Sequence, residues 1–333
     1  MLILISLNNV VYLQNQDELK DVQKWLYLNT DKHYSYKEIK NMESLYISFQ
    51  YKSKDDDLKY LKHFPNLKEL EIFFKKIKSD NFSYVLSLKK LERLYIYGSK
   101  LNKYDMVRLN LLKNLKTLYL DKPISDTMLT YLKDLIQLNE LHISGDNITD
   151  KGLKVITGLT NLKILEVPNT SITSNGAQYL QRLKHLEKLD ISSTLITNYG
   201  LSYIRSLSNL KELILDNTKI TDLSNIKSLK NIEKLSLYSC KISNETLIPL
   251  RSFYKLKYLN IDTNTFLYTI TDKGLKNISH LINLEELFLP LWGITDNGLK
   301  HLRYLVNLQY LSPLGDGVSD EGLVYLKNMI KLK

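Results

Sequence analysis

The 333-residue sequence predicts an α/β fold, a solenoid in which a short strand and a helix alternate along most of the chain. Three observations favour this fold. The pattern LxxLxL recurs about every 24 residues, and a polar helix start follows it at a similar distance in many units. Each such unit is also too small to bury its own apolar side chains, so stacked neighbours must share one core.

The strand of each unit is predicted by the alternation LxL, because a period of two places one face of a short strand in the core. We expect twelve repeats over residues 42–333 and an amino-terminal cap over residues 1–41, with a degenerate repeat and a helix. The LxxLxL pattern begins at Met42, Leu67, Leu91, Leu115, Leu138, Leu162, Leu186, Leu210, Ile232, Leu256, Leu284 and Leu308.

The helix of each unit is predicted by a change of period after the strand. In residues 148–156 the Thr149–Asp150 pair predicts an N-cap, and Leu153 and Ile156 fall on one helical face. Equivalent starts occur at Thr271, Thr295 and Ser319. Strands connected through helices in this way form a parallel sheet.

The second position of the pattern alternates in charge through much of the chain. In a parallel stack these side chains are lateral neighbours about 4.8 Å apart, so opposite charges meet and the register is favoured. The series is Glu43, Lys68, Glu92, Lys116, Asn139, Lys163, Glu187, Lys211, Glu233, Lys257 and Glu285.

Composition limits the protein class. A hydrophobic content of 44% and a charged content of 25% are typical of globular proteins and exclude a disordered, collagen-like or mainly membrane-embedded chain. No run of about 18 apolar residues is present, so we expect no transmembrane segment. Residues 1–7 lack the basic start of a signal peptide, and Cys240 is the single cysteine. A cytoplasmic location is therefore expected.

These units resemble the leucine-rich-repeat superfamily, and the ITDxGL helix starts look like its ribonuclease-inhibitor-like and GALA-type repeats. The resemblance implies a right-handed horseshoe with the parallel sheet on the concave face and the helices on the convex face. It also implies that Cys240 is a buried member of the polar ladder after the strands, together with Thr170, Thr194 and Thr218, rather than a nucleophile.

The strand side chains that point away from the core, at positions three, five and seven, supply the candidate site. They include ten acidic, three basic and nine aromatic residues. Exposed aromatics beside acidic residues are typical of a protein interface. The predicted partner-binding residues are Tyr46, Phe73, Tyr95, Tyr97, Tyr119, Glu140, Glu166, Asp190, Asp216, Tyr238, Tyr258, Asp262, Phe288 and Tyr310. A second candidate is the insertion at residues 264–269, which carries two aromatics; a tolerated surface insertion is its simpler interpretation.

We therefore predict a monomeric, non-enzymatic scaffold that binds a protein or extended peptide with basic and apolar residues. The alternative is the substrate-recognition subunit of a ubiquitin-ligase-type complex, or a secreted effector acting in a host cytoplasm. The net charge of +10 must lie mainly on the convex side, so we expect no specific nucleic acid in the concavity. The six histidines are scattered, and we expect no catalytic residues, cofactor or metal.

Overall fold

The computed structural model describes residues 17–48, 55–73, 78–98, 101–121, 124–264, 270–312 and 315–333. Two compact units make up the chain: unit 1 is Met1–Ile124 and unit 2 is Ser125–Lys333. Residues 1–7 and most of the insertion at 264–269 lie outside the described residues.

The described part of unit 1 contains a helix over residues 17–30, followed by alternating helices and strands. Its elements are α2 Tyr36–Asn41, β1 Ser44–Ser48, η1 Asp55–His63, β2 Glu69–Phe73, α3 Ser79–Leu86, β3 Arg93–Tyr97, α4 Lys103–Arg108, η2 Leu109–Leu111 and β4 Thr117–Leu120, where η denotes a 3-10 helix.

Unit 2 repeats the same alternation with shorter strands. Its elements are α5 Asp126–Leu129, η3 Thr130–Leu132, β5 Glu140–Ile143, α6 Asp150–Ile156, β6 Ile164–Glu166, η4 Gly176–Arg182, β7 Lys188–Asp190, α7 Asn198–Ile204, β8 Glu212–Ile214, η5 Ser224–Ile226, β9 Lys234–Ser236, η6 Glu245–Ser252, β10 Tyr258–Asn260, α8 Asp272–Leu275, β11 Glu286–Phe288, α9 Asp296–Leu302, β12 Tyr310–Leu311, α10 Asp320–Leu323 and η7 Val324–Leu326. In the described part of the chain, no helix is long and apolar enough to cross a bilayer.

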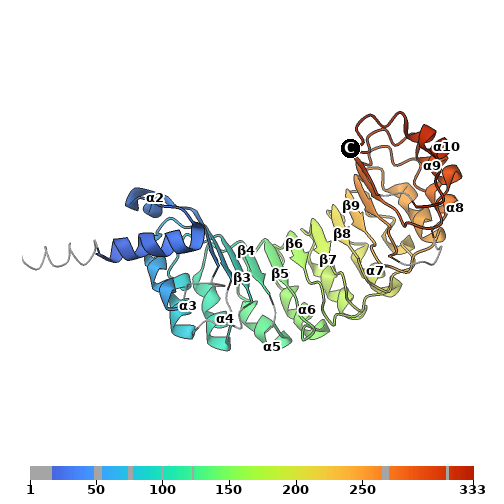
Figure 1. The fold of residues 1–333 in the computed structure, drawn as a ribbon. Helices are drawn as coiled ribbons and strands as arrows, with labels where there is room; N and C mark the ends of the chain where they lie inside the picture. The colour runs from blue at the N-terminus through green and yellow to red at the C-terminus, as the bar shows by residue number, and fades with distance from the viewer. Residues whose placement is uncertain are drawn as a thin grey trace, which may run out of the picture. The chain divides into compact units, whose positions relative to one another are not determined.

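The strands are parallel and stand in chain order within each unit, β1 to β4 in unit 1 and β5 to β12 in unit 2. Equivalent leucines pair from one repeat to the next, as in Leu70 with Leu94 and Leu189 with Leu213. In unit 2 the helices α6 and α7 lie on one side of the strands (Figure 1). The predicted parallel α/β solenoid is confirmed.

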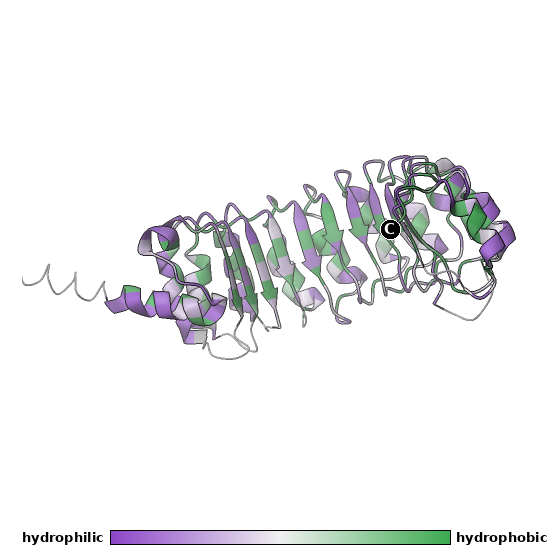
Figure 2. Ribbon diagram, turned by 45° about the horizontal axis from the view of Figure 1, so that its top comes forward, coloured by the Kyte–Doolittle hydropathy of each residue, from purple (hydrophilic) through white to green (hydrophobic). Residues whose placement is uncertain are grey.

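The core lies between the strands and the helices of each unit. In the repeat that starts at Leu186, the residues Leu186, Leu189 and Ile191 are fully buried, and so are Leu201 and Ile204 of α7. Figure 2 shows hydrophobic and hydrophilic bands alternating along the strands, as the LxL pattern requires. Each buried leucine or isoleucine contributes about 1.5 to 3 kcal/mol, so the repeated leucines dominate the stability of the fold.

The amino-terminal helix of unit 1 covers apolar side chains of the first repeat. Val22 and Leu26 are fully buried, and Trp25 is nearly so. The Trp25 ring lies 5.5 Å from the Tyr60 ring and 6.2 Å from the Phe64 ring, both on or next to η1. The helix therefore shields the end of the unit 1 core from water.

Four helix starts of unit 2 are completed by a carboxylate from the preceding repeat. Thr149 is the N-cap of α6 and accepts a hydrogen bond from Lys151 N, as predicted. Asp150, the second residue of the predicted pair, does not cap this helix with its side chain, so that part of the prediction is wrong. Asp126 instead accepts hydrogen bonds from Thr149 N at 2.8 Å and Gly152 N at 2.9 Å, one repeat further on. Asp150, Asp272 and Asp296 bridge to the next repeat in the same way.

The glycine of the ITDxGL segment is explained by the same bridge. A Cβ on Gly152 would lie 2.4 Å from Asp126 Oδ1, and one on Gly176 would lie 2.1 Å from Asp150 Oδ1. The aspartate of the preceding repeat therefore occupies the space that any larger residue needs. The spacing of the motif reflects contact between repeats as well as helix initiation.

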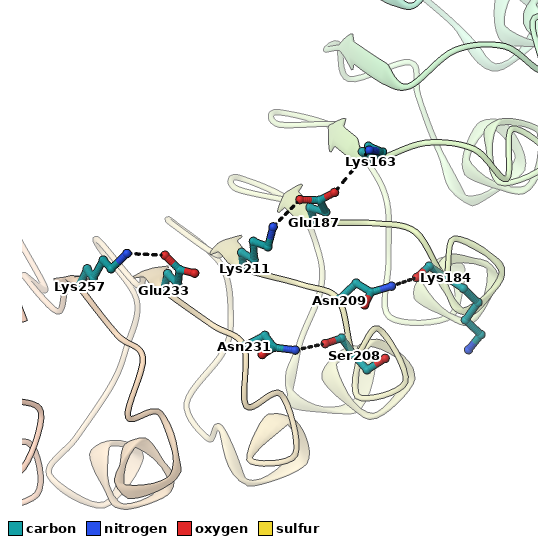
Figure 3. A network of polar contacts seen from close by, with 9 residues as sticks. All are labelled: Lys163, Lys184, Glu187, Ser208, Asn209, Lys211, Asn231, Glu233 and Lys257. Atoms are coloured by element: carbon teal, nitrogen blue, oxygen red, sulfur yellow. Dashed lines mark hydrogen bonds and ion pairs between the residues drawn. The ribbon is translucent and has the colours of Figure 1, made fainter. Parts of the chain in front are cut away.

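The predicted charge ladder forms along the edge where the strands begin (Figure 3). Lys211 Nζ lies 2.7 Å from Glu187 Oε2, and Lys163 Nζ lies 3.8 Å from Glu187 Oε1, so Glu187 stands between two lysines. Lys257 and Glu233 pair at 2.8 Å. These pairs are half-exposed, so solvent screens them and each contributes little to stability.

A second ladder, of asparagines, lies beside the charge ladder and was not predicted. The residue before the first leucine of many repeats is asparagine, and its amide donates to a main-chain carbonyl of the preceding repeat. Figure 3 shows two examples, Asn209 to Lys184 O at 2.9 Å and Asn231 to Ser208 O at 2.9 Å. Other members are Asn66, Asn114, Asn161, Asn283 and Asn307.

We expect Asn209→Ala to lower the free energy of unfolding by about 1 kcal/mol, because the carbonyl of Lys184 loses its hydrogen-bond donor. Urea denaturation followed by circular dichroism measures the change. Asn297→Ala is the control: its side chain is exposed on α9, and we expect a change below about 0.5 kcal/mol there. An equal loss in both variants would contradict a structural role for the asparagine ladder.

The polar ladder after the strands is also present. Thr170, Thr194 and Thr218 are buried, and each hydroxyl donates to the carbonyl three residues before it. Cys240 takes the next place: its Sγ lies 3.1 Å from Leu215 O and 3.5 Å from Thr218 Oγ1. Burial raises the pKa of the Cys240 thiol, so the thiol stays protonated and unreactive. The prediction of a buried ladder member is confirmed.

Candidate partner-binding surface

The strand face is our name for the side of the sheet in each unit that carries positions three, five and seven of the repeats. On β3 the core positions Leu94 and Ile96 are buried, whereas Arg93, Tyr95 and Tyr97 on the other side are half-buried. Eleven of the fourteen predicted residues stand within strands. The other three, Asp216, Tyr238 and Asp262, follow β8, β9 and β10 by two residues.

Four rings on neighbouring strands of unit 1 form one group, the unit-1 aromatic cluster: Phe73, Tyr95, Tyr97 and Tyr119. The Phe73 and Tyr97 rings are stacked at 6.1 Å, and the Tyr97 and Tyr119 rings are 4.6 Å apart. Tyr95 lies 6.3 Å from Tyr119. Tyr46, on β1 of the same unit, is 50% exposed. The cluster is therefore an ordered aromatic surface outside the core.

The chemistry of the unit-1 aromatic cluster is set by its partial burial. Burial, and to a lesser degree the carboxylate of Glu71, raises the pKa of Tyr97 to about 12. Burial, followed by the charge of Glu69, raises the pKa of Glu71 above its ordinary value. Tyr97 is thus a neutral hydrogen-bond donor at physiological pH, beside a carboxylate that is poorly hydrated.

Three rings of unit 2 form a second group, the unit-2 aromatic cluster: Tyr258, Phe288 and Tyr310. The Tyr258 and Phe288 rings are 5.3 Å apart, and the Phe288 and Tyr310 rings are 4.8 Å apart. The ammonium of Lys234 lies 4.5 Å from the centre of the Tyr258 ring, a cation–π contact. Tyr238 is 37% exposed on the same face, two residues after β9.

The predicted acidic residue Glu166 is the centre of an ion-pair network in unit 2. His142 Nδ1 lies 2.7 Å from Glu166 Oε2, and Lys188 Nζ lies 2.7 Å from Glu166 Oε1. The contact with His142 lowers the pKa of Glu166 to about 2; burial opposes this effect, and the hydrogen bond from Lys188 adds to it. Glu166 is therefore an internally neutralised carboxylate. Glu140, on β5, is half-buried on the same face.

The predicted residues Asp190, Asp216 and Asp262 accept hydrogen bonds within the chain. Asp190 accepts from Ser192 N at 2.8 Å, Asp216 from Tyr238 N at 2.8 Å, and Asp262 from Asn264 N at 2.9 Å. Burial raises the pKa of both Asp190 and Asp216, although the hydrogen bonds oppose the shift. These carboxylates hold the loops after the strands, and a lysine at either place would disturb folding as well as binding.

The basic members of this surface were missed as site residues. His142, Lys188 and Lys234 contact predicted residues and reduce the negative charge of the strand face. The sequence spacing could have identified the contact between His142 and Glu166, because the two residues are one repeat apart and pair directly in the register of β5 and β6. Counting charges by position alone overlooks this neutralisation.

A polar cavity of about 520 Å³ in unit 2 lies away from the predicted residues, along the two ladders. Its lining groups are largely paired with one another: Lys257 with Glu233, Gln309 with Glu285, and Lys331 with Asn307. Within the ranges that the structure describes, no group of three or more His, Cys, Asp or Glu side chains is placed to hold a metal ion.

Comparisons with known proteins show the fold. No protein-family model matches the chain, and no curated protein matches its sequence. The crystal structure of an internalin (inlF) from Listeria monocytogenes str. 4b F2365 is similar over 94% of this chain and 93% of its own, with 21% identity and a TM-score of 0.64. TLR13, in its complex with ssRNA13, is similar over 81% of this chain and 42% of its own, with 19% identity and a TM-score of 0.54.

Internalin and TLR13 are both leucine-rich-repeat proteins, so the predicted leucine-rich-repeat fold is confirmed. At these identities the likeness concerns the fold alone. The narrower ribonuclease-inhibitor-like subtype stays a prediction.

Proposed function

We propose that the protein is a non-enzymatic interaction scaffold that binds a protein partner on its strand face, with the unit-1 aromatic cluster as an anchor. The single observation that carries this proposal is the contact among Phe73, Tyr97 and Tyr119 at 4.6 to 6.1 Å on the side of the sheet away from the core. These rings are ordered before any partner binds, so little conformational entropy is lost on binding.

The energetics of such a cluster suit a binding anchor. Aromatic side chains concentrate the binding energy of protein interfaces, and aromatic pairs add about 0.5 to 1.5 kcal/mol beyond their buried area. The core of unit 1 is already filled by leucines and isoleucines on the opposite side of the sheet. The rings lie outside this core, where an apolar surface of a partner can cover them.

The charge of the strand face favours a protein partner over nucleic acid. Ten acidic and three basic residues occupy its positions, whereas phosphate backbones require a basic surface. The solved structure of TLR13 is a complex with ssRNA13. The excess of acidic residues at the strand-face positions of this chain supports a different class of ligand. The monomeric state and the cytoplasmic location stay predictions from the sequence.

The expected result of replacing Tyr95, Tyr97 and Tyr119 with alanine is loss of partner capture by at least about tenfold, because the anchor is removed. Affinity capture from the source cells, followed by quantitative mass spectrometry, identifies the proteins that the wild type retains and the triple variant loses. Thermal unfolding of both proteins shows whether the variant is folded, and Tyr119→Ala alone serves as a milder variant.

Tyr104→Ala is the matched control, because Tyr104 is 66% exposed on α4 and stands outside the strand face. Capture should be unchanged in this variant. The proposal fails if the folded triple variant and Tyr104→Ala retain the same partners in the same amounts. Ligase subunits among the proteins lost from the triple variant would favour the adaptor alternative.

A further inference from the structure

A glutamate stands between two tyrosines at two places on the strand face. In unit 1 the register pairs Tyr46 of β1 with Glu71 of β2, and Glu71 with Tyr95 of β3. A phenylalanine follows this glutamate by two residues on the same face: Phe73. We call this set the unit-1 Tyr–Glu–Tyr triplet. Neighbouring strands are about 4.8 Å apart, so both tyrosines border the carboxylate.

The same arrangement recurs in unit 2. The register pairs Tyr258 of β10 with Glu286 of β11, and Glu286 with Tyr310 of β12. Phe288 follows the glutamate by two residues, as Phe73 follows Glu71. These residues form the unit-2 Tyr–Glu–Tyr triplet. The two glutamates share these flanking tyrosines, although Glu71 is half-buried and Glu286 is exposed.

Among the residues that the structure describes, these two glutamates differ from neighbouring carboxylates in having no hydrogen-bond or ion-pair partner. Glu69 pairs with Arg93 at 3.0 Å, and Glu166 pairs with His142 and Lys188. In the described residues, the carboxylates of Glu71 and Glu286 make no hydrogen bond or ion pair. Glu71 is half-buried, and an ionised carboxylate that is partly dehydrated without a partner is unfavourable. A cation from outside the chain would relieve this cost.

The tyrosine rings of this protein already accept cations. Lys234 Nζ lies 4.5 Å from the centre of Tyr258, a member of the unit-2 triplet. On the helix side, the guanidinium carbon of Arg303 lies 4.6 Å from the centre of Tyr304. Guanidinium is planar, pairs with a carboxylate through two hydrogen bonds and stacks on aromatic faces, whereas ammonium is a compact, strongly hydrated charge. The triplets combine the two surfaces that guanidinium favours.

We propose that each Tyr–Glu–Tyr triplet binds an arginine side chain of the protein partner, with the glutamate pairing with the guanidinium and the tyrosine rings stacking on it. The inference rests on the proposed function, since it assigns the chemistry of the partner that the strand face binds. In this proposal Glu71 and Glu286 recognise an arginine of the partner, rather than an apolar side chain.

The test measures binding of a fluorescein-labelled peptide with two arginines separated by glycines, by fluorescence anisotropy at low salt. Wild-type protein should bind it, and Glu71→Gln should weaken the affinity about tenfold, because the guanidinium loses its charged partner in the unit-1 triplet. Glu71→Gln/Glu286→Gln should weaken it further. Replacing the arginines with citrulline, which is neutral and similar in shape, should weaken binding by about tenfold or more.

Glu92→Gln is the matched control, because it removes the same charge from the same unit at the charge ladder, where Glu92 pairs with Lys116. Its affinity should stay within about twofold of the wild type. Equal binding by Glu71→Gln/Glu286→Gln and Glu92→Gln overturns the inference, and so does equal binding of the arginine and citrulline peptides. A lysine peptide that binds as tightly as the arginine peptide also overturns it.

The two proposals fail separately. If Glu71→Gln binds the arginine peptide normally while the Tyr95, Tyr97 and Tyr119 variant loses the cellular partner, the scaffold function stands and the arginine inference is wrong. If the peptide results are as expected while that variant retains the cellular partner, the arginine sites exist and the proposed anchor is wrong.

Discussion

Replacing Gly176 with alanine is expected to lower the free energy of unfolding by about 3 kcal/mol. The new Cβ would lie 2.1 Å from Asp150 Oδ1, so the carboxylate must leave its place. Asp150 accepts hydrogen bonds from Thr173 N and Thr173 Oγ1, both at 2.7 Å, and its displacement breaks both. Urea denaturation followed by circular dichroism measures the loss.

Two further variants separate steric conflict from a general effect of glycine replacement. Gly158→Ala should change the unfolding free energy by less than about 1 kcal/mol, because its nearest contact is Val155 O at 3.2 Å. In Asp150→Ala/Gly176→Ala the conflict is absent, and the loss should be close to that of Asp150→Ala alone. Full additivity of the two single losses would show that the carboxylate is not the obstacle.

Replacing Glu166 with glutamine is expected to lower the unfolding free energy by about 2 to 3 kcal/mol at neutral pH. The pKa of Glu166 falls from an ordinary value of 4.5 to about 2, chiefly through its contact with His142. A lowered pKa in the folded state means that this stabilisation is present above pH 4.5 and is lost as the pH falls toward 2. The side chain is 21% exposed, so solvent screening reduces the effect only in part.

Denaturation of the wild type and Glu166→Gln across this pH range measures the prediction. The difference between them should shrink steadily on acidification, because a protonated glutamate resembles glutamine. Glu187→Gln, on the more exposed charge ladder, should cost less than about 1 kcal/mol at any pH. A difference for Glu166→Gln that is the same at neutral and acidic pH would contradict the ion-pair account.

Much of the fold follows from the sequence, because the leucine period predicts both where each strand lies and which of its side chains are buried. Leu186, Leu189 and Ile191 are buried where LxxLxL predicts, and the alternating charges at Glu187 and Lys211 meet across neighbouring repeats. Both results depend only on the position of a residue within a repeat that recurs in register. The period also assigns each of the fourteen predicted site residues to the strand face of its own unit.

The detailed contacts of the site could not be predicted in the same way, because a period specifies the direction of a side chain but not its rotamer or partner. Asp190 accepts a hydrogen bond from Ser192 N in its own loop, and Asp216 accepts one from Tyr238 N in the next repeat. Lys188 reaches diagonally to Glu166 at 2.7 Å and also lies 3.7 Å from Glu212, its direct neighbour in the register of β7 and β8. Glu71, by contrast, was counted as one acid among ten, and its isolation emerges only when every neighbouring pair is known.

The bridge between an aspartate and the helix start of the next repeat also bears on how such a chain changes over generations. Where both neighbours keep the Asp and Thr partners, as at Asp272 and Thr295, recombination can duplicate or delete a whole repeat and leave a matched joint. Asn198 is different, because its amide both accepts from Thr221 N and donates to Thr221 Oγ1. We therefore expect whole repeats to be gained or lost first at places where an aspartate of one repeat bonds to the helix start of the next.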